Sequence, residues 1–395
     1  MPASPSTARA INDRLALRLL QQEGPLTAGQ LKQLTGLSRP SVADLVERLT
    51  ASGLIAVVGE AGEQRRGPNA KLYGIVADRA HLAALDVRTD GVSVAVSDLV
   101  GRVLAEASAP IVTDAGTGPA VERAVALVER TAKEAGADRL HTVGIGAPGL
   151  IDPATGELRD TTGLPAWHRR FVAALQERLP EARVIVENET NLAALAEQRD
   201  GAAGDRDTFV LLWLGHGTGA AVVLDGALRR GASGGTGEIG FLPVPGTTGL
   251  PSATDCEGGF HSLAGSAAIA RLAGEYGLTG TPAGSEPPAA AVVREAAARD
   301  FGPAARFLDA LADRLAIGVA SVVAVLDPGC VVLGGEVGQA GGDALAQRVA
   351  ARVHRMSPLP TSVRAGVLGG GAVLRGALLT ARDTAQDELF APPGR

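Results

Sequence analysis

The chain has 395 residues, of which 46% are hydrophobic and 20% are charged, and its formal net charge at pH 7 is −6. This length and apolar content exclude an intrinsically disordered chain and predict two or three globular units. The 2 cysteines, Cys256 and Cys330, lie far apart in sequence, which argues against a disulfide scaffold and for a reducing, cytoplasmic location.

The charge is distributed unevenly along the chain. Residues 1–80 contain 10 Lys/Arg and 7 Asp/Glu, whereas the remainder contains 27 and 36. A basic segment in front of an acidic body indicates a module that binds a polyanion. No apolar run reaches the roughly 18 residues that a membrane span needs, and charges interrupt the apolar stretch at the N-terminus. We therefore expect neither a membrane partner nor a signal peptide.

The first eighty residues predict three helices followed by a β-hairpin. Ile11, Leu15 and Leu19 recur at helical spacing, and Thr27 and Ser38 have the side chains that cap the N-termini of two further helices. Two strand-like runs then flank a polar, glycine-rich tip. We expect the helices to share one small core, made of Leu31, Leu34, Leu37, Val42, Leu45, Val46 and Leu49.

This order of elements is typical of a winged helix-turn-helix domain, which we expect to span residues 1–78. The third helix would lie in the major groove of double-stranded DNA, and the arginines of the hairpin would reach phosphates or a minor groove. The alternative is a helical protein-interaction domain whose polar face is only solvated. The predicted DNA-contacting residues are Thr27, Ser38, Arg39, Pro40, Ser41, Asp44, Arg48, Arg65, Arg66, Gly67 and Lys71.

The rest of the chain contains a duplicated β-rich unit. Residues 81–110 and 209–231 each read as strand, tight turn, strand, turn and strand, and Ala-rich helical segments separate them. Two such units predict a bilobal actin-like, or ribonuclease-H-like, α/β fold with a cleft between the lobes. We expect lobe 1 to span residues 79–185, completed by a C-terminal helix at 373–390, and lobe 2 to span residues 186–372.

Segments spread along the body carry a resemblance to a known family. They read GIGAPGLIDPATGEL, TTGLPAW, VENETNLAALAE, LGHGTGAAVVLDGALRRGASGGTGEIG and LDPGCVVLGGEVG. In order and spacing they resemble the ROK family of repressors, open reading frames and kinases, and the resemblance covers nearly the whole chain. The winged helix in front is similar to the regulator branch of that family.

The resemblance also implies what a sugar kinase of this family would need. Its phosphate hairpin reads Asp-x-Gly-Gly-Thr, whereas this chain reads DVRTD over residues 86–90, which places Asp90 against phosphate. Its catalytic base is an Asp, and Glu189 stands at that position. The longer side chain shifts the carboxylate by about 1 Å, which can cost on the order of a hundredfold in rate. We therefore expect no catalytic residues and no kinase activity.

The structural zinc site of the family is also altered in this sequence. Phe241 stands at the position of a histidine ligand, and Cys256 is the only thiol in the region that supplies three cysteines. Cys256 and His261 could provide two ligands, whereas structural zinc takes four. We therefore expect no zinc and no other cofactor.

Some sugar-binding positions of the family are retained. Asn188, Glu189 and Glu238 match residues that bind sugar hydroxyls, and Ser262 replaces a sugar-binding Glu. These residues predict a ligand site for a sugar or sugar derivative in the interlobe cleft. Alternatively, Glu238 caps backbone amides in its glycine-rich turn, and Glu189 merely orders the start of the following helix.

The sequence thus predicts a transcriptional regulator, by family resemblance a repressor, without kinase activity. It would act as a homodimer or tetramer on a palindromic operator in double-stranded DNA and would respond to a sugar effector. Two alternatives remain open: a bifunctional sugar kinase and regulator, and a DNA-binding scaffold that binds no ligand.

Overall fold

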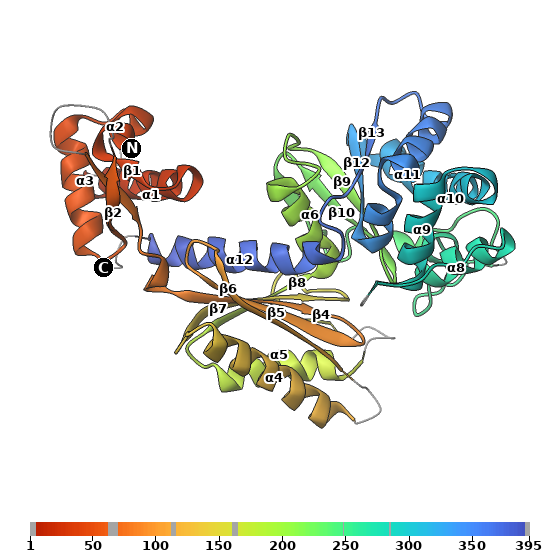
Figure 1. Cartoon of the computed structure of the whole chain (residues 1–395), viewed down its shortest axis with the longest axis horizontal. Coiled ribbons are helices and arrows are strands. Elements are labelled where there is room, and N and C mark those ends of the chain that lie inside the picture. Colours follow the sequence, from red (N-terminus) through yellow and green to blue (C-terminus); the bar gives the residue numbers. More distant parts are fainter. Residues whose placement is uncertain are drawn as a thin grey trace.

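The computed structural model describes residues 5–61, 70–111, 116–159, 165–247, 249–283 and 286–391. Figure 1 shows a small N-terminal head, a two-lobed body and one long helix, α12 (Ala372–Leu389), that connects them. The predicted fold class, a winged helix-turn-helix head followed by a bilobal α/β body, is confirmed. None of the helices in the described ranges is long and apolar enough to cross a membrane.

The head combines helices with a small antiparallel sheet of order β1-β3-β2. Thr27 begins α2 with a capping box, in which its hydroxyl accepts from the Gln30 amide and the Gln30 side chain accepts from the Thr27 amide. The Ser38 hydroxyl accepts from the Ser41 amide at the start of α3. The elements of the head are α1 (Pro5–Glu23), β1 (Leu26–Thr27), α2 (Ala28–Thr35), α3 (Arg39–Ala51), β2 (Ile55–Ala61) and β3 (Ala70–Ile75).

The core of the head differs from the prediction in two places. Leu31 and the apolar residues of α3 are buried as expected, but Leu34 is 50% exposed. In α1, Ile11 and Leu15 are exposed, whereas Leu17 on another face of the helix is fully buried. The reason is that α1 packs against the body as well as against the head. Its buried face joins a cluster that includes Leu82, Leu99, Ala381, Ala385 and Phe390.

Lobe 1 is built on a five-stranded sheet of order β6-β5-β4-β7-β8. The strands β4, β5 and β6 are antiparallel neighbours, and β7 and β8 continue the sheet parallel to β4. Helices α4 and α5 cover one face, and α12 lies on the other (Figure 1). The elements are β4 (His81–Val87), β5 (Gly91–Asp98), β6 (Val103–Pro110), α4 (Thr117–Glu134), β7 (Leu140–Ala147), α5 (Trp167–Arg178) and β8 (Arg183–Asn188). A short 3-10 turn, η1 (Ala77–Arg79), precedes the lobe.

Lobe 2 repeats this topology, which accounts for the duplication in the sequence. Its sheet has the order β11-β10-β9-β12-β13, with an antiparallel first half and a parallel second half. Its elements are α6 (Glu189–Asp200), β9 (Phe209–Leu214), β10 (Thr218–Leu224), β11 (Ala227–Arg229), η3 (Ile239–Phe241), α7 (His261–Ala264), α8 (Ser266–Glu275), α9 (Pro288–Arg299), α10 (Gly302–Leu326), β12 (Cys330–Gly334), α11 (Gly335–Met356), β13 (Ser362–Ala365) and η4 (Gly369–Gly371).

The boundary between the lobes lies three residues later than expected. Strand β8 pairs with β7 along its whole length, up to the pair Ala147–Asn188. The predicted boundary between residues 185 and 186 therefore falls inside a strand of lobe 1. The strand ends where the Asn188 side chain caps α6, and α6 packs on the sheet of lobe 2.

Helix α12 is packed unusually close to both lobes. It lies against β4 and β7 on one side and against α6 on the other. A side chain at Gly144 would collide with the carbonyl of Ala377, and one at Gly376 would collide with the carbonyl of Leu192. Glycine at these positions lets backbone approach backbone. The opposite end of α12 meets the head, where the Gln386 amide donates to Gln21 at 2.8 Å and to the Leu99 carbonyl at 2.9 Å.

Candidate functional site

The N-terminus of α3 is an exposed polar surface that contains four of the predicted DNA contacts. Ser38, Arg39, Pro40 and Ser41 are all exposed there. Backbone amides at a helix N-terminus carry partial positive charge, and Arg39 adds a full charge beside them. The arrangement suits a phosphate or the edge of a base in DNA.

Arg48 and Asp44 form ion pairs within the head. The Arg48 guanidinium is half-buried, forms an ion pair with Asp13 of α1 at 2.6 Å and bonds to Asp44 one turn earlier. The pair with Asp13 joins α3 to α1, whereas Asp44 stays exposed on α3. The assignment of Arg48 and Asp44 as DNA contacts stays a prediction.

The remaining predicted DNA contacts lie around the hairpin and the start of α2. Lys71 on β3 is exposed, as a phosphate contact requires. The Thr27 hydroxyl is partly buried and engaged in the capping box. Arg65, Arg66 and Gly67 lie outside the described residues.

A cavity of about 510 Å³ lies between the lobes, and it brings together three of the four predicted ligand residues. Asn188, Glu189 and Glu238 line it. Ser262 does not, because its hydroxyl accepts from the Gly258 amide at 2.9 Å and holds the turn before α7. The complete lining is Gly149, Leu150, Asn188, Glu189, Thr190, Trp213, Gly217, Thr218, Gly219, Glu238, Phe241, Ala253 and Thr254.

Asn188 shapes the cavity wall and caps α6 at the same time. Its Oδ1 accepts from the amides of Thr190 at 2.9 Å and Asn191 at 3.4 Å, and its Nδ2 donates to the carbonyl of Gly149 at 2.9 Å. The amide group thus ties lobe 1 to the start of α6. One N–H of its Nδ2 is left over for a ligand.

The Glu189 carboxyl has an unusual protonation state. Loss of solvent around it and the negative charges of Asp86, Glu336 and Glu238 together raise the pKa of this carboxyl to about 8, against the opposing positive charge of Arg88. At pH 7 the carboxyl is therefore mostly protonated. A neutral carboxylic acid donates a hydrogen bond and accepts another, which is what recognition of a hydroxyl group requires, and it cannot act as a base.

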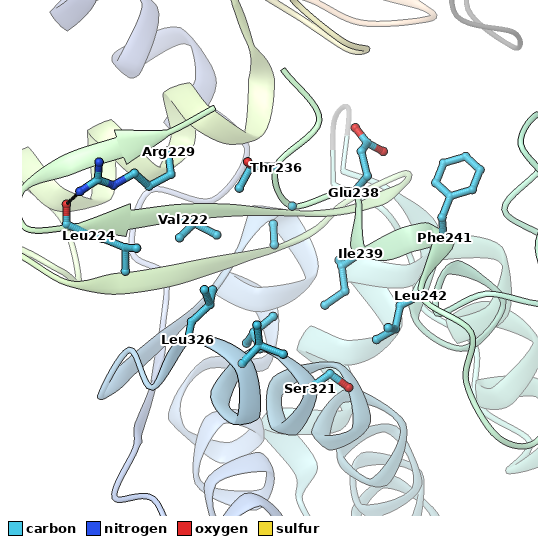
Figure 2. A pocket seen from close by; sticks show the side chains of 14 residues that line it. Val222, Leu224, Arg229, Thr236, Glu238, Ile239, Phe241, Leu242, Ser321 and Leu326 are labelled. Atoms are coloured by element: carbon cyan, nitrogen blue, oxygen red, sulfur yellow. Dashed lines mark hydrogen bonds between the residues drawn. The ribbon is translucent and has the colours of Figure 1, made fainter. Parts of the chain in front are cut away.

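Glu238 and Phe241 stand on the segment that separates this cavity from a second, apolar one. In Figure 2 their side chains project to one side of the chain, whereas Ile239 and Leu242 project toward α10. The predicted alternative was that Glu238 caps local amides. Among the described residues, no hydrogen bond links its carboxylate to a backbone amide, which favours the ligand assignment.

The altered phosphate turn contributes a residue that the sequence analysis did not single out. Arg88 projects between the lobes into the wall of a cavity of about 850 Å³. Its guanidinium contacts Asp86 at 2.9 Å, Glu336 of α11 at 2.6 Å and the Gly370 carbonyl of η4 at 2.9 Å. The sequence signal that could have identified Arg88 is its position, which is a glycine in the phosphate hairpin of the family's kinases.

The region of the expected zinc site contains one half-buried free thiol, that of Cys256. Within the described ranges, no three His, Cys, Asp or Glu side chains come close enough to hold a metal ion. His261 instead approaches the Thr218 hydroxyl at 3.4 Å. The absence of zinc and of other cofactors stays a prediction.

Comparison with known proteins gives relatives among both regulators and kinases. The chain is 25% identical over 238 residues to the xylose repressor of Caldicellulosiruptor bescii, which covers 60% of this chain and 59% of that protein. It is 27% identical over 274 residues to a glucokinase of Thermotoga maritima, which covers 66% of this chain and 83% of the enzyme. The chain thus spans about three fifths of the length of the repressor that it matches.

A solved structure has the same fold over nearly the whole chain. The crystal structure of a ROK family transcriptional regulator, a homolog of the E. coli MLC protein, superposes with a TM-score of 0.74 at 21% identity and covers 97% of this chain and 98% of its own. Residues 11–67 of this chain match the MarR family. Residues 82–384 match the ROK family, and the chain therefore belongs to the ROK family.

Proposed function

We propose that this protein is a DNA-binding transcriptional regulator that senses a sugar or sugar derivative in the cavity between its lobes. One observation carries the proposal: the helix-turn-helix head is docked on α12, whose opposite end lies beside the larger interlobe cavity, of about 850 Å³. A ligand between the lobes is thereby connected mechanically to the DNA-binding surface. The repressors among its relatives support the same function.

The connection runs through packed secondary structure. Helix α6 begins at Asn188 and Glu189 in the cavity wall and packs against α12. Helix α12 holds α1 of the head through Gln386 and Gln21 and through the ion pair of Asp387 with Arg14 at 2.8 Å. A change in lobe angle on ligand binding would therefore move the head. An effector can drive that change only by binding two arrangements with different affinity.

We further propose that the protein acts as a homodimer, or as a tetramer of such dimers. Two heads related by two-fold symmetry require an operator with two inverted half-sites. Movement of the heads would change the spacing between them, and with it the fit to the operator. We expect repression of transcription rather than activation, because a blocked promoter is the simplest outcome of operator binding.

A substitution in α3 tests the DNA-binding surface. Arg39→Ala should weaken binding to a DNA fragment selected from the genome by the wild-type protein by about tenfold to a hundredfold, and should relax its sequence preference, because a bidentate contact to a base contributes roughly 1–3 kcal/mol. Lys133→Ala on α4 of lobe 1 is the matched control and should bind as the wild type does. Fluorescence anisotropy at fixed salt measures the affinity of both variants for the fragment. Equal affinities would contradict the assignment of Arg39 as a DNA contact.

The chemistry of the cavity supports a polyhydroxylated ligand. Glu189 presents a protonated carboxyl, Glu238 presents a carboxyl that bonds to no backbone amide among the described residues, and Phe241 offers the apolar face of a ring. Hydrogen bonds to a charged group contribute about 1.5–3 kcal/mol each. Loss of one such group should therefore remove most of the affinity for a small sugar.

Calorimetry with a panel of sugars and sugar phosphates tests the ligand site. The wild type should give saturable binding for one member of the panel, and Glu238→Ala should lower that affinity by at least tenfold. Glu257→Ala, on an exposed residue outside the cavity lining, should leave the affinity unchanged. If no member of the panel binds, the alternative of a scaffold without a ligand is favoured over a sensor.

The protonation of Glu189 predicts a distinctive dependence of stability on pH. Its pKa rises from 4.5 to about 8 on folding, so its contribution to stability is complete below about 4.5 and is lost as the pH rises toward 8. Glu189→Gln cannot ionise. Its melting temperature should exceed that of the wild type by an amount that is small near pH 4.5 and grows steadily up to pH 8, because each unit of the pKa shift corresponds to about 1.4 kcal/mol. A constant difference between the variants across this range would show that the carboxyl is ionised in the folded protein.

The rival function is that of a bifunctional sugar kinase and regulator. It remains an alternative because the chain is similar to a glucokinase. We propose that the protein lacks this activity, because Arg88 is engaged with two carboxylates at the altered phosphate turn and Glu189 is protonated at neutral pH. A coupled assay of ATP consumption over the same sugar panel should give no turnover above background. Typical kinase rates of about 1–100 per second would overturn this part of the proposal.

A further inference from the structure

The side chain of Arg88 joins segments that are remote in sequence. Its contacts with Glu336 and Gly370 connect residues 248 and 282 positions apart. The backbone of Arg88 is itself held in lobe 1, because its amide donates to the Gly91 carbonyl at 2.8 Å and its carbonyl lies 3.2 Å from Nε2 of the buried His168. The guanidinium is therefore anchored in one lobe and bonded in the other.

The three acceptors suit a guanidinium and no other side chain. Nε donates to Asp86 of β4, one terminal nitrogen donates to Glu336 at the start of α11, and the other donates to the Gly370 carbonyl. A lysine ammonium is a point charge and cannot match this planar fork. The Asp86 and Glu336 side chains are only 4% and 13% exposed. Without a cation between them, two poorly solvated negative charges would face each other across the lobes.

We propose that Arg88 is an interlobe tie, which fixes the angle between the lobes by bonding Asp86 of lobe 1 to Glu336 and Gly370 of lobe 2. The tie does so without any bound ligand. Gly370 lies two residues before the first residue of α12, so the tie also fixes the start of the helix that carries the head. Any ligand that changes the lobe angle must break or rearrange these contacts.

The charges around Arg88 support the tie over a site for an anionic ligand. The large cavity beside it is lined by the carboxylates of Asp86, Asp90, Glu286 and Glu336. Its other arginine, Arg294, is paired with Glu286 at 3.0 Å, within lobe 2. Both arginines of the lining are thus neutralised by neighbouring carboxylates. The excess of carboxylates in the cavity disfavours a phosphate, and Arg88 offsets the two charges that face each other across the lobes.

A distance measurement between the lobes tests the tie. Spin labels are placed on Lys133 of α4 and Arg271 of α8, both exposed, in a Cys256→Ser background that leaves the fully buried Cys330 in place. Arg88→Met should give a longer mean distance and a broader distribution than the wild type in pulsed electron resonance, because the repulsion of Asp86 and Glu336 is no longer balanced. Arg88→Lys should give a mean distance and a width between those of Arg88→Met and the wild type, since lysine keeps the positive charge but lacks the planar guanidinium.

Arg294→Met is the matched control, because it removes a cation from the same cavity without cutting a link between the lobes. It should give the distance distribution of the wild type. If Arg88→Met does not fold, Glu336→Gln provides the test, since it weakens the same tie from lobe 2 and should also broaden the distribution. Coincident distributions for the Arg88 variants and the wild type, or an equal change in Arg294→Met, would overturn the proposal.

Discussion

The close packing of α12 against both lobes is the constraint on which the rest of the structure depends. Backbone meets backbone where Gly144 of β7 and Gly376 of α12 leave no room for a side chain. Interfaces of this kind do not deform gradually, because interiors are packed as densely as crystals. Lobe 1, α6 of lobe 2 and the head therefore share one rigid element. Under the proposed function, a ligand in the cavity would displace that element and the head with it.

The interlobe region is shaped by an excess of negative charge in a poorly solvated space. Besides burial, the negative charges of Asp86 and Glu336 raise the pKa of the Glu189 carboxyl, and that of Glu336 also raises the pKa of Asp86. Two of these charges are compensated by Arg88, and the third is reduced by protonation. Burial of several carboxylates together would otherwise cost a large amount of free energy. This compensation stabilises the fold around the two interlobe cavities.

In the head, some polar residues of α3 are engaged in structural contacts and others are exposed. The Ser38 hydroxyl accepts from the Ser41 amide, and Arg48 pairs with Asp13 between α3 and α1. Arg39 is left exposed beside the helix N-terminus. The paired arginine and the exposed arginine are thus separated by their positions on the same helix.

The sequence alone determined the fold class, the order of elements and three residues of the cavity wall, Asn188, Glu189 and Glu238. Local capping signals at Thr27 and Ser38, alternating apolar strands and the duplicated hairpin are sufficient for this, because they act over short stretches of chain. Only the tertiary structure decided which face of α1 is buried, that Arg48 is paired, that β8 extends to Asn188 and that Ser262 lies outside the cavity. Each of these depends on a contact between segments remote in sequence. The tie of Arg88 to Glu336 is the clearest case, since no local pattern relates residues 248 positions apart.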